Sequence, residues 1–310
     1  MHTCQEKKLH FGYVVAAGLI ILMIPECFPM NTASIFYTPV SRELQIPVDT
    51  FGFHMTLLTM SMALSVPLIE RIFDRIDSRL FLTVVVAVEA AMFFINSTAR
   101  SVSVFYGTSI VLGFVMSVYL YFALPMLMNR WFAVRSVFMI GLCGAAQGLW
   151  GMVFNTLGGI IIDGIGWRGC YRIWALVSLA AGLPAALLLI SDSPAKKGLT
   201  PVGWERRPNP AEKTITAITN EQAKAIKRSR PYILMTLFEG ILALSMTINF
   251  YMGDYIRSKG GSTVMTGIAA SAVMLGTMLG KIIVGYVSDK HLKTGLLLAL
   301  IPAIISVPML

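Results

Sequence analysis

The chain has 310 residues, of which 56% are hydrophobic and only 13% are charged, and its formal net charge is +9. Soluble domains carry roughly a quarter charged residues, so this composition excludes a water-soluble globular protein and indicates a protein built into a membrane. A basic excess is also typical of nucleic-acid binding, but its distribution along this chain, described below, argues against that class.

Eight long apolar runs follow one another along the chain. Each is long enough to cross the ~30 Å hydrocarbon layer, and only a helix satisfies its own backbone groups there. The predicted spans are residues 11–36, 51–70, 80–98, 102–128, 136–162, 170–190, 232–256 and 263–287. A ninth run begins near residue 296 and is incomplete at Leu310. The sequence therefore predicts an all-α polytopic membrane protein.

One polar, basic segment divides the spans six plus two. We predict that residues 1–191 form an N-terminal six-helix bundle, that residues 192–231 form a cytoplasmic linker, and that residues 232–310 form a partial second bundle. The linker is interpreted either as a strap on the lipid surface or as a plain connection. The early end of the ninth run favours a C-terminally truncated copy of a longer protein.

Lysine and arginine are distributed unevenly between alternate loops. With the N-terminus placed inside, the inner segments carry 19 of these residues and the outer segments carry 6. This positive-inside bias predicts a multi-pass protein of the cell membrane with its N-terminus and its central linker in the cytoplasm. The basic excess is thus explained by topology, and nucleic acid is not an expected partner.

Ionisable residues inside membrane spans are costly and are functional candidates. Glu26 lies between Pro25 and Pro29, which are expected to interrupt the helical hydrogen bonds of the first span, and Asn31 follows on the same segment. Glu239 lies about two turns into the seventh span, which is the counterpart of the first span in the second half. Either glutamate could carry a proton or could make a structural hydrogen bond, and the sequence does not choose between these roles.

Lys281 lies about two turns before Asp289 in the eighth span, so its ammonium needs a partner, a wet cavity, or a path to cytoplasmic water by snorkelling. Gln147 and Tyr119 are further candidates for a cavity, although tyrosines in such helices more often serve packing. Glu89 lies in the middle of the third span without an evident role. We find no pattern of a cofactor site or of a catalytic site, and the prediction is a protein that is not an enzyme.

Two loops resemble each other at equivalent places in the two halves. Residues 70–79 read ERIFDRIDSR, and residues 280–290 read GKIIVGYVSDK. Both resemble the G-x-x-x-D-[RK] loop that follows helices 2 and 8 in the major facilitator superfamily. The first copy departs from it, because Glu70 stands where the family usually has glycine.

Three shorter strings are more specific. They are NRWF at 129–132, GWR with YR at 166–172, and SP with GLTPVG at 193–203. Together they resemble the branch that contains oxalate/formate antiporters and monocarboxylate transporters, which have twelve helices. The resemblance implies a monomeric secondary transporter, a symporter or an antiporter, that moves a small organic anion by alternating access, with a proton or a counter-anion as coupling partner. The alternatives are a non-transporting fragment of such a protein and a transporter of a different small solute.

The resemblance also implies site residues. Lys281 aligns with a cation that binds the substrate carboxylate, although Thr277 stands where proton-coupled members carry an acid. The expected substrate-binding set is Lys281, Glu26, Asn31, Glu239, Gln147 and Tyr119. The expected gate at the cytoplasmic rim consists of Asp74, Arg75, Arg79, Arg130, Arg135, Asp289 and Lys290. Asp289 should lie near Arg135 and Ser136, unless these charges serve only as positive-inside anchors.

Small residues spaced four apart let helices approach closely. In the fifth span they are Gly141, Gly144, Gly148 and Gly151, and in the eighth span they are Gly276 and Gly280. The fifth and eighth helices cross in the family, so we expect these glycines to form the contact between the two halves.

Overall fold

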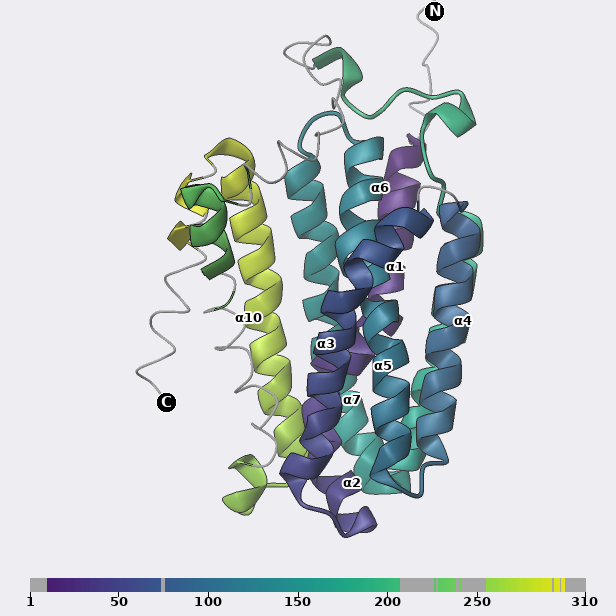
Figure 1. Cartoon of the computed structure of the whole chain (residues 1–310), viewed down its shortest axis with the longest axis vertical. Helices are drawn as coiled ribbons and strands as arrows, with labels where there is room; N and C mark the ends of the chain where they lie inside the picture. The colour runs from purple at the N-terminus through teal and green to yellow at the C-terminus, as the bar shows by residue number, and fades with distance from the viewer. Residues whose placement is uncertain are drawn as a thin grey trace, which may run out of the picture.

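The computed structural model describes residues 10–73, 76–206, 226, 228–237, 240, 255–291, 293–295 and 297–298. Over this part of the chain the fold is helical throughout, with long helices standing side by side (Figure 1). It contains no β-strand within those ranges, only one isolated bridge between Phe132 and Val202. The predicted all-α membrane fold is confirmed.

The first helix, α1 (Phe11–Asn31), is followed by a 3₁₀ turn, η1 (Ala33–Ile35), and by a short helix, α2 (Tyr37–Leu44). The predicted span of 11–36 was therefore too long. Pro25 and Pro29 both lie inside α1 and do not end it. Because proline has no backbone N–H, each of them removes one helical hydrogen bond, as expected, yet the helix continues through both. Membrane helices tolerate proline where neighbouring groups satisfy the backbone.

The next three predicted spans are confirmed with small changes at their ends. They are α3 (Val48–Phe73), α4 (Ser78–Ser97), and a continuous run made of α5 (Val102–Ser117), η2 (Val118–Ala123) and α6 (Leu124–Trp131). The middle piece, η2, is π-helical.

The fifth and sixth predicted spans are joined more tightly than expected. Helix α7 (Ser136–Val177) continues through two π-helical turns, η3 (Ser178–Gly182) and η4 (Ala185–Leu189). Its course is broken at Gly166, whose φ of 79° and ψ of 168° are not helical. Because a positive φ is readily adopted only by glycine, this residue makes the turn between the two spans without a loop.

The second half is described in part. Residues 230–237 are helical, and α10 (Thr263–Lys290) covers the eighth predicted span. Most of the predicted span 232–256, including Glu239, lies outside the described residues, as does nearly all of the ninth run. Within the described residues, six helical stretches are long and apolar enough to cross a membrane, and the stretch Ser136–Leu189 is counted as one despite its turn at Gly166.

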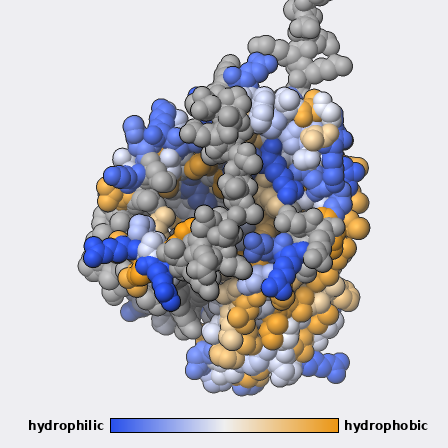
Figure 2. Space-filling view, turned by 45° about the horizontal axis from the view of Figure 1, so that its top comes forward, coloured by the Kyte–Doolittle hydropathy of each residue, from blue (hydrophilic) through white to orange (hydrophobic). Residues whose placement is uncertain are grey.

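Helix α7 is central to the packing. It contacts α1, α4 and α10, while α3 packs on α5. The outer faces of the helices carry exposed leucines such as Leu64, Leu68 and Leu188, as expected for contact with lipid. In Figure 2, hydrophilic residues gather at the end of the molecule that comes forward, and hydrophobic residues cover the flank below it. The surface pattern therefore fits a bundle with polar ends and apolar sides.

Residues 190–206 lie against one end of the bundle, which we call the linker end (Figure 1). The Trp131 indole donates to the Ser191 carbonyl (2.8 Å). Val202 exchanges backbone hydrogen bonds with Trp131 (2.8 Å) and Ala133 (3.0 Å). The first part of the predicted linker is thus fixed to the N-terminal helices.

Carboxylates at the linker end cap the start of α4. Asp77 accepts from the Arg79 amide (2.9 Å), and Asp192 accepts from the Ser78 amide (2.7 Å). Lys196 donates to both carboxylates. Negative groups at a helix N-terminus satisfy free N–H groups and oppose the helix dipole, so this cluster joins residues 192–196 to α4.

Candidate functional site

Five helical elements each place one polar side chain at a similar depth. They are Glu26 on α1, Glu89 on α4, Tyr119 on η2, Gln147 on α7 and Lys281 on α10. Each lies between 9 and 15 residues from the linker end of its helix. At 1.5 Å per residue this is about 14–22 Å, which is near the middle of a ~30 Å hydrocarbon layer.

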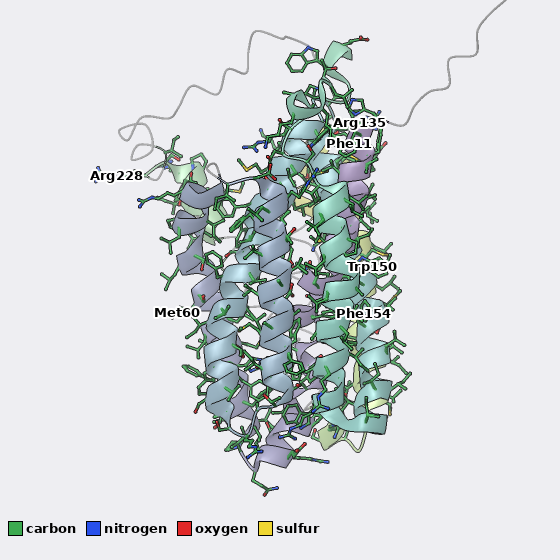
Figure 3. The ribbon with its side chains drawn as sticks, turned by 90° about the vertical axis from the view of Figure 1, so that its right-hand side faces the viewer. Phe11, Met60, Arg135, Trp150, Phe154 and Arg228 are labelled. Carbon is green, nitrogen blue, oxygen red and sulfur yellow. The ribbon has the colours of Figure 1, made fainter. Side chains whose placement is uncertain are left out.

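Figure 3 places Phe11 and Arg135 at the linker end of the bundle and Trp150 further along its length. The Trp150 indole donates to the Ile20 carbonyl (2.8 Å), which ties α7 to α1 at this depth. Gln147 lies about one turn from Trp150 towards the linker end.

A chain of hydrogen bonds connects α10 to α1 through α7. The Lys281 ammonium donates to the Gln147 carbonyl oxygen, and the Gln147 amide nitrogen donates to the Glu26 carboxylate (2.6 Å). Lys281 also donates to the Gly144 carbonyl (3.2 Å). The amide of Gln147 presents its acceptor to the cation and its donor to the anion, so it links two charges that do not touch each other.

A second pair lies beside this chain. The Tyr119 hydroxyl donates to Glu89 (3.0 Å), and both side chains are fully buried. Glu89 is close enough to Glu26 for their charges to interact. Sequence reasoning found no role for Glu89, yet the structure places it in the polar interior.

Close packing of α7 on α10 positions Lys281 and Gln147. A Cβ atom at Gly141 would lie 2.9 Å from the Lys281 carbonyl oxygen, and one at Gly148 would lie 2.7 Å from the Met274 carbonyl oxygen. The glycines of α7 therefore form the expected contact. The expectation for Gly276 and Gly280 was wrong, because no described atom lies within 4 Å of a Cβ at either position.

The remaining substrate candidates are placed as follows. Asn31 ends α1, and its carbonyl accepts from the Asn155 amide (2.9 Å), while its own side-chain nitrogen has no partner among the described residues. It makes no hydrogen bond to the chain of Lys281, Gln147 and Glu26. Glu239 lies outside the described residues.

The predicted gate residues at the linker end have separate contacts. The Arg79 guanidinium donates to the Ile190 carbonyl (3.2 Å), and Lys290 donates to the Tyr286 hydroxyl (2.6 Å) on its own helix. Arg135 is the N-cap of α7 and has a φ of 59°, and Arg130 lies in the last turn of α6. Asp74 and Arg75 lie outside the described residues.

The end of α10 lies beside the start of α7, as expected. The ring centroids of Phe138 and Tyr286 are 6.3 Å apart. Asp289, less than one turn further along, is exposed and makes no hydrogen bond or ion pair in the part of the chain that the structure describes. A latch between Asp289 and Arg135 therefore stays a prediction.

Apolar helices of membrane-spanning length, with a buried chain of ionisable groups between them, define a polytopic membrane protein with a polar interior. A comparison with protein families matches residues 19–310 to the Major Facilitator Superfamily. The chain belongs to this superfamily, whose members are membrane transporters. A comparison with curated proteins finds no match.

Proposed function

We propose that this protein is a secondary active transporter of a small organic anion, a mono- or dicarboxylate, in the cell membrane. Lys281 carries the proposal. It places a positive charge near mid-membrane, and within the described residues its partners are a neutral amide and a backbone carbonyl, with no carboxylate in direct contact. A cation held in this way can accept a substrate carboxylate, which would supply the missing direct counter-charge.

The position of Lys281 also fits alternating access. Substrate sites of such transporters lie near the bilayer midplane between repeats. Lys281 belongs to the second half, Gln147 and Glu26 belong to the first, and their hydrogen bonds cross the contact between α7 and α10. An anion bound to Lys281 would replace the bond to Gln147 and so change the strength of that contact. A proton or a counter-anion is the proposed coupling partner.

The charged residues at the linker end are proposed to gate the inner side. Asp289 and Lys290 lie in the last turn of α10, and Arg135 is the N-cap residue of α7. Arg79 and Arg130 lie on the first-half helices around residues 190–202. With the N-terminus and the linker in the cytoplasm, this rim would close when the two halves tilt together.

Anion binding to the purified chain tests the proposal. Radiolabelled acetate and oxalate would serve as probes, in detergent and in proteoliposomes. Lys281→Ala should weaken binding of whichever probe binds by roughly 30-fold or more, corresponding to about 2 kcal/mol for an unpaired buried charge. Lys281→Arg should keep part of the affinity, because it keeps the charge while changing its geometry.

The matched control is Lys293→Ala, which removes an exposed lysine just beyond α10. It should leave affinity unchanged. Equal affinity in Lys281→Ala and in the parent chain would exclude Lys281 as the anion contact. A lysine that only snorkels to water predicts that result.

A further inference from the structure

The proposed function does not use the pair of buried carboxyl groups on α1 and α4. Glu26 and Glu89 are both 0% exposed. Each has one oxygen with a hydrogen-bond donor, Gln147 for Glu26 and Tyr119 for Glu89. The other oxygen of each, Glu26 Oε2 and Glu89 Oε1, is buried without a partner among the described residues.

The charges around this pair do not balance. Within the described residues, Glu89 interacts with the charge of Glu26 and with the hydroxyl of Tyr119, and neither group is a cation. Lys281 acts on Glu26. Two carboxylates would therefore share one ammonium, and a full negative charge would remain in an apolar interior.

Burying a carboxylate without a counter-charge in an apolar interior is unfavourable in free energy. Neighbouring buried carboxyl groups avoid a second negative charge by holding one proton between them. One proton also changes the hydrogen bonding of the carboxyl oxygens that lack a partner. A protonated carboxyl is a donor as well as an acceptor, so it can use one of the two oxygens that lack a partner. The same single proton thus removes the excess negative charge and gives one of these oxygens a hydrogen to donate.

We propose that Glu26 and Glu89 form a proton-binding pair that holds one exchangeable proton, with Tyr119 orienting Glu89 and Gln147 orienting Glu26. The proton-binding site belongs to the first-half helices and does not need a substrate to exist. Tyr119 and Gln147 are positioning residues, since each fixes one carboxyl oxygen and leaves the other free for the proton.

A coupling to transport follows, and this part rests on the proposed function. Among the described residues, Lys281 is the one cation whose charge acts on Glu26. An anion on Lys281 neutralises that charge, so the pair should bind a proton more tightly when the anion is bound. By reciprocity the proton should strengthen anion binding by the same factor. A proton and an anion would then be carried together.

Infrared spectroscopy of the purified chain tests the pair directly. The carbonyl stretch of a protonated carboxylic acid is separate from the absorption of carboxylates and is followed as pH is changed, without added anion. We expect one protonated carboxyl per chain at pH 7. Tyr119→Phe should shift its frequency, because the hydrogen bond to Glu89 is lost.

Single variants distinguish a pair from an isolated acid. Glu26→Gln and Glu89→Gln each remove one negative charge, so the remaining carboxyl should release its proton at a pH at least about one unit lower, a tenfold loss of proton affinity. The control Glu70→Gln changes an exposed carboxyl at the end of α3 and should leave the spectrum at pH 7 unchanged. A parent chain without any protonated carboxyl at pH 7, or single variants in which the remaining carboxyl titrates as before, would overturn the proposal.

Adding acetate or oxalate separates the two proposals. If both hold, the anion raises the pH at which the pair releases its proton, and Lys281→Ala removes this effect. If the anion-free titration behaves as expected but neither anion changes it, the proton pair stands and the proposed substrate class fails. If an anion binds through Lys281 but no protonated carboxyl is found, the substrate class stands and the pair fails.

Discussion

Gly148 is a position where α7 leaves no room for a side chain against α10. A Cβ atom there would lie 2.7 Å from the Met274 carbonyl oxygen, 2.8 Å from the Met278 amide nitrogen and 2.9 Å from Met278 Cβ. Two of these atoms belong to the backbone of α10 and cannot rotate away. Ordinary contacts of this kind begin near ~3.5 Å, so Gly148→Ala should push the two helices apart by several tenths of an ångström.

Two effects of this substitution have opposite sign. Alanine favours a helix over glycine by about 1 kcal/mol, and overpacking a close contact costs about 1–3 kcal/mol. Gly276→Ala is the matched control, because Gly276 lies on α10, is exposed and has no described atom within 4 Å of a Cβ. The propensity gain is common to both variants, so their difference isolates the steric cost. We expect Gly148→Ala to be less stable than Gly276→Ala by about 1–3 kcal/mol.

The chain carries its own reporter of unfolding. Once Cys4 is replaced by serine, the remaining cysteines are Cys27, Cys143 and Cys170. These three are free and buried, so a fluorogenic maleimide should react with them only as the bundle opens. The unfolding temperature of Gly148→Ala should fall below that of Gly276→Ala by roughly 2–4 °C for each kcal/mol. Equal unfolding temperatures for the two variants would show that α7 and α10 are not in backbone contact at Gly148, and would remove the basis for placing Lys281 beside Gln147.

Two further predictions concern the linker end and the topology. Burial acts to raise the pKa of Asp192, but hydrogen bonds from Lys196 and from the Ser78 amide outweigh it and hold this pKa below its ordinary value. A carboxyl of this kind stabilises the fold above its unfolded-state pKa, and the contribution is lost as pH falls through the lower folded-state value. At pH 7, Asp192→Asn should therefore be less stable than the parent chain by about 1 kcal/mol and should unfold at a lower temperature. This difference should disappear as pH falls through the lowered folded-state pKa, whereas equal stability at pH 7 would contradict the role of the charge. For the topology, a membrane-impermeant maleimide should label Arg100→Cys in intact cells and Glu205→Cys only after permeabilisation, and the reverse pattern would invert the orientation.

The number and order of the first spans were predictable because a membrane leaves few choices for an apolar run of twenty residues. The ends were less predictable. Helix α1 continues through Pro25 and Pro29 and ends at Asn31, where the hydroxyl of the C-cap residue Thr32 donates to the Phe28 carbonyl (2.8 Å). Such a bond depends on a side-chain rotamer, which the sequence does not reveal. The short helix α2 was missed because its eight residues follow an apolar run without a break.

The site was predictable in part. Lys281, Gln147 and Glu26 stand out in sequence because polar groups inside spans need partners, and the structure joins these three. Glu89 was left without a role because the lipid-facing side of α4 is as apolar as its inner side. Its position on the buried stripe with Val85, Val86 and Phe93 therefore gave no periodic signal, and only packing reveals which way the helix is rotated.

The packing on both sides of the turn at Gly166 limits how the protein can move. The part of α7 before the turn carries Gln147 and packs on α10, and the part after it, with η3 and η4, packs on α1 and α4. The part before the turn is also bonded to α1, through Trp150 to the Ile20 carbonyl (2.8 Å) and Asn155 to the Asn31 carbonyl (2.9 Å), so the two parts of α7 are expected to travel together with α1 and α4. Relative motion is then left to the surface between α7 and α10. The hydrogen bond from Lys281 to Gln147 crosses that surface. A ligand that breaks this hydrogen bond would therefore act directly on the contact at which the two halves move, without a change in the other helices.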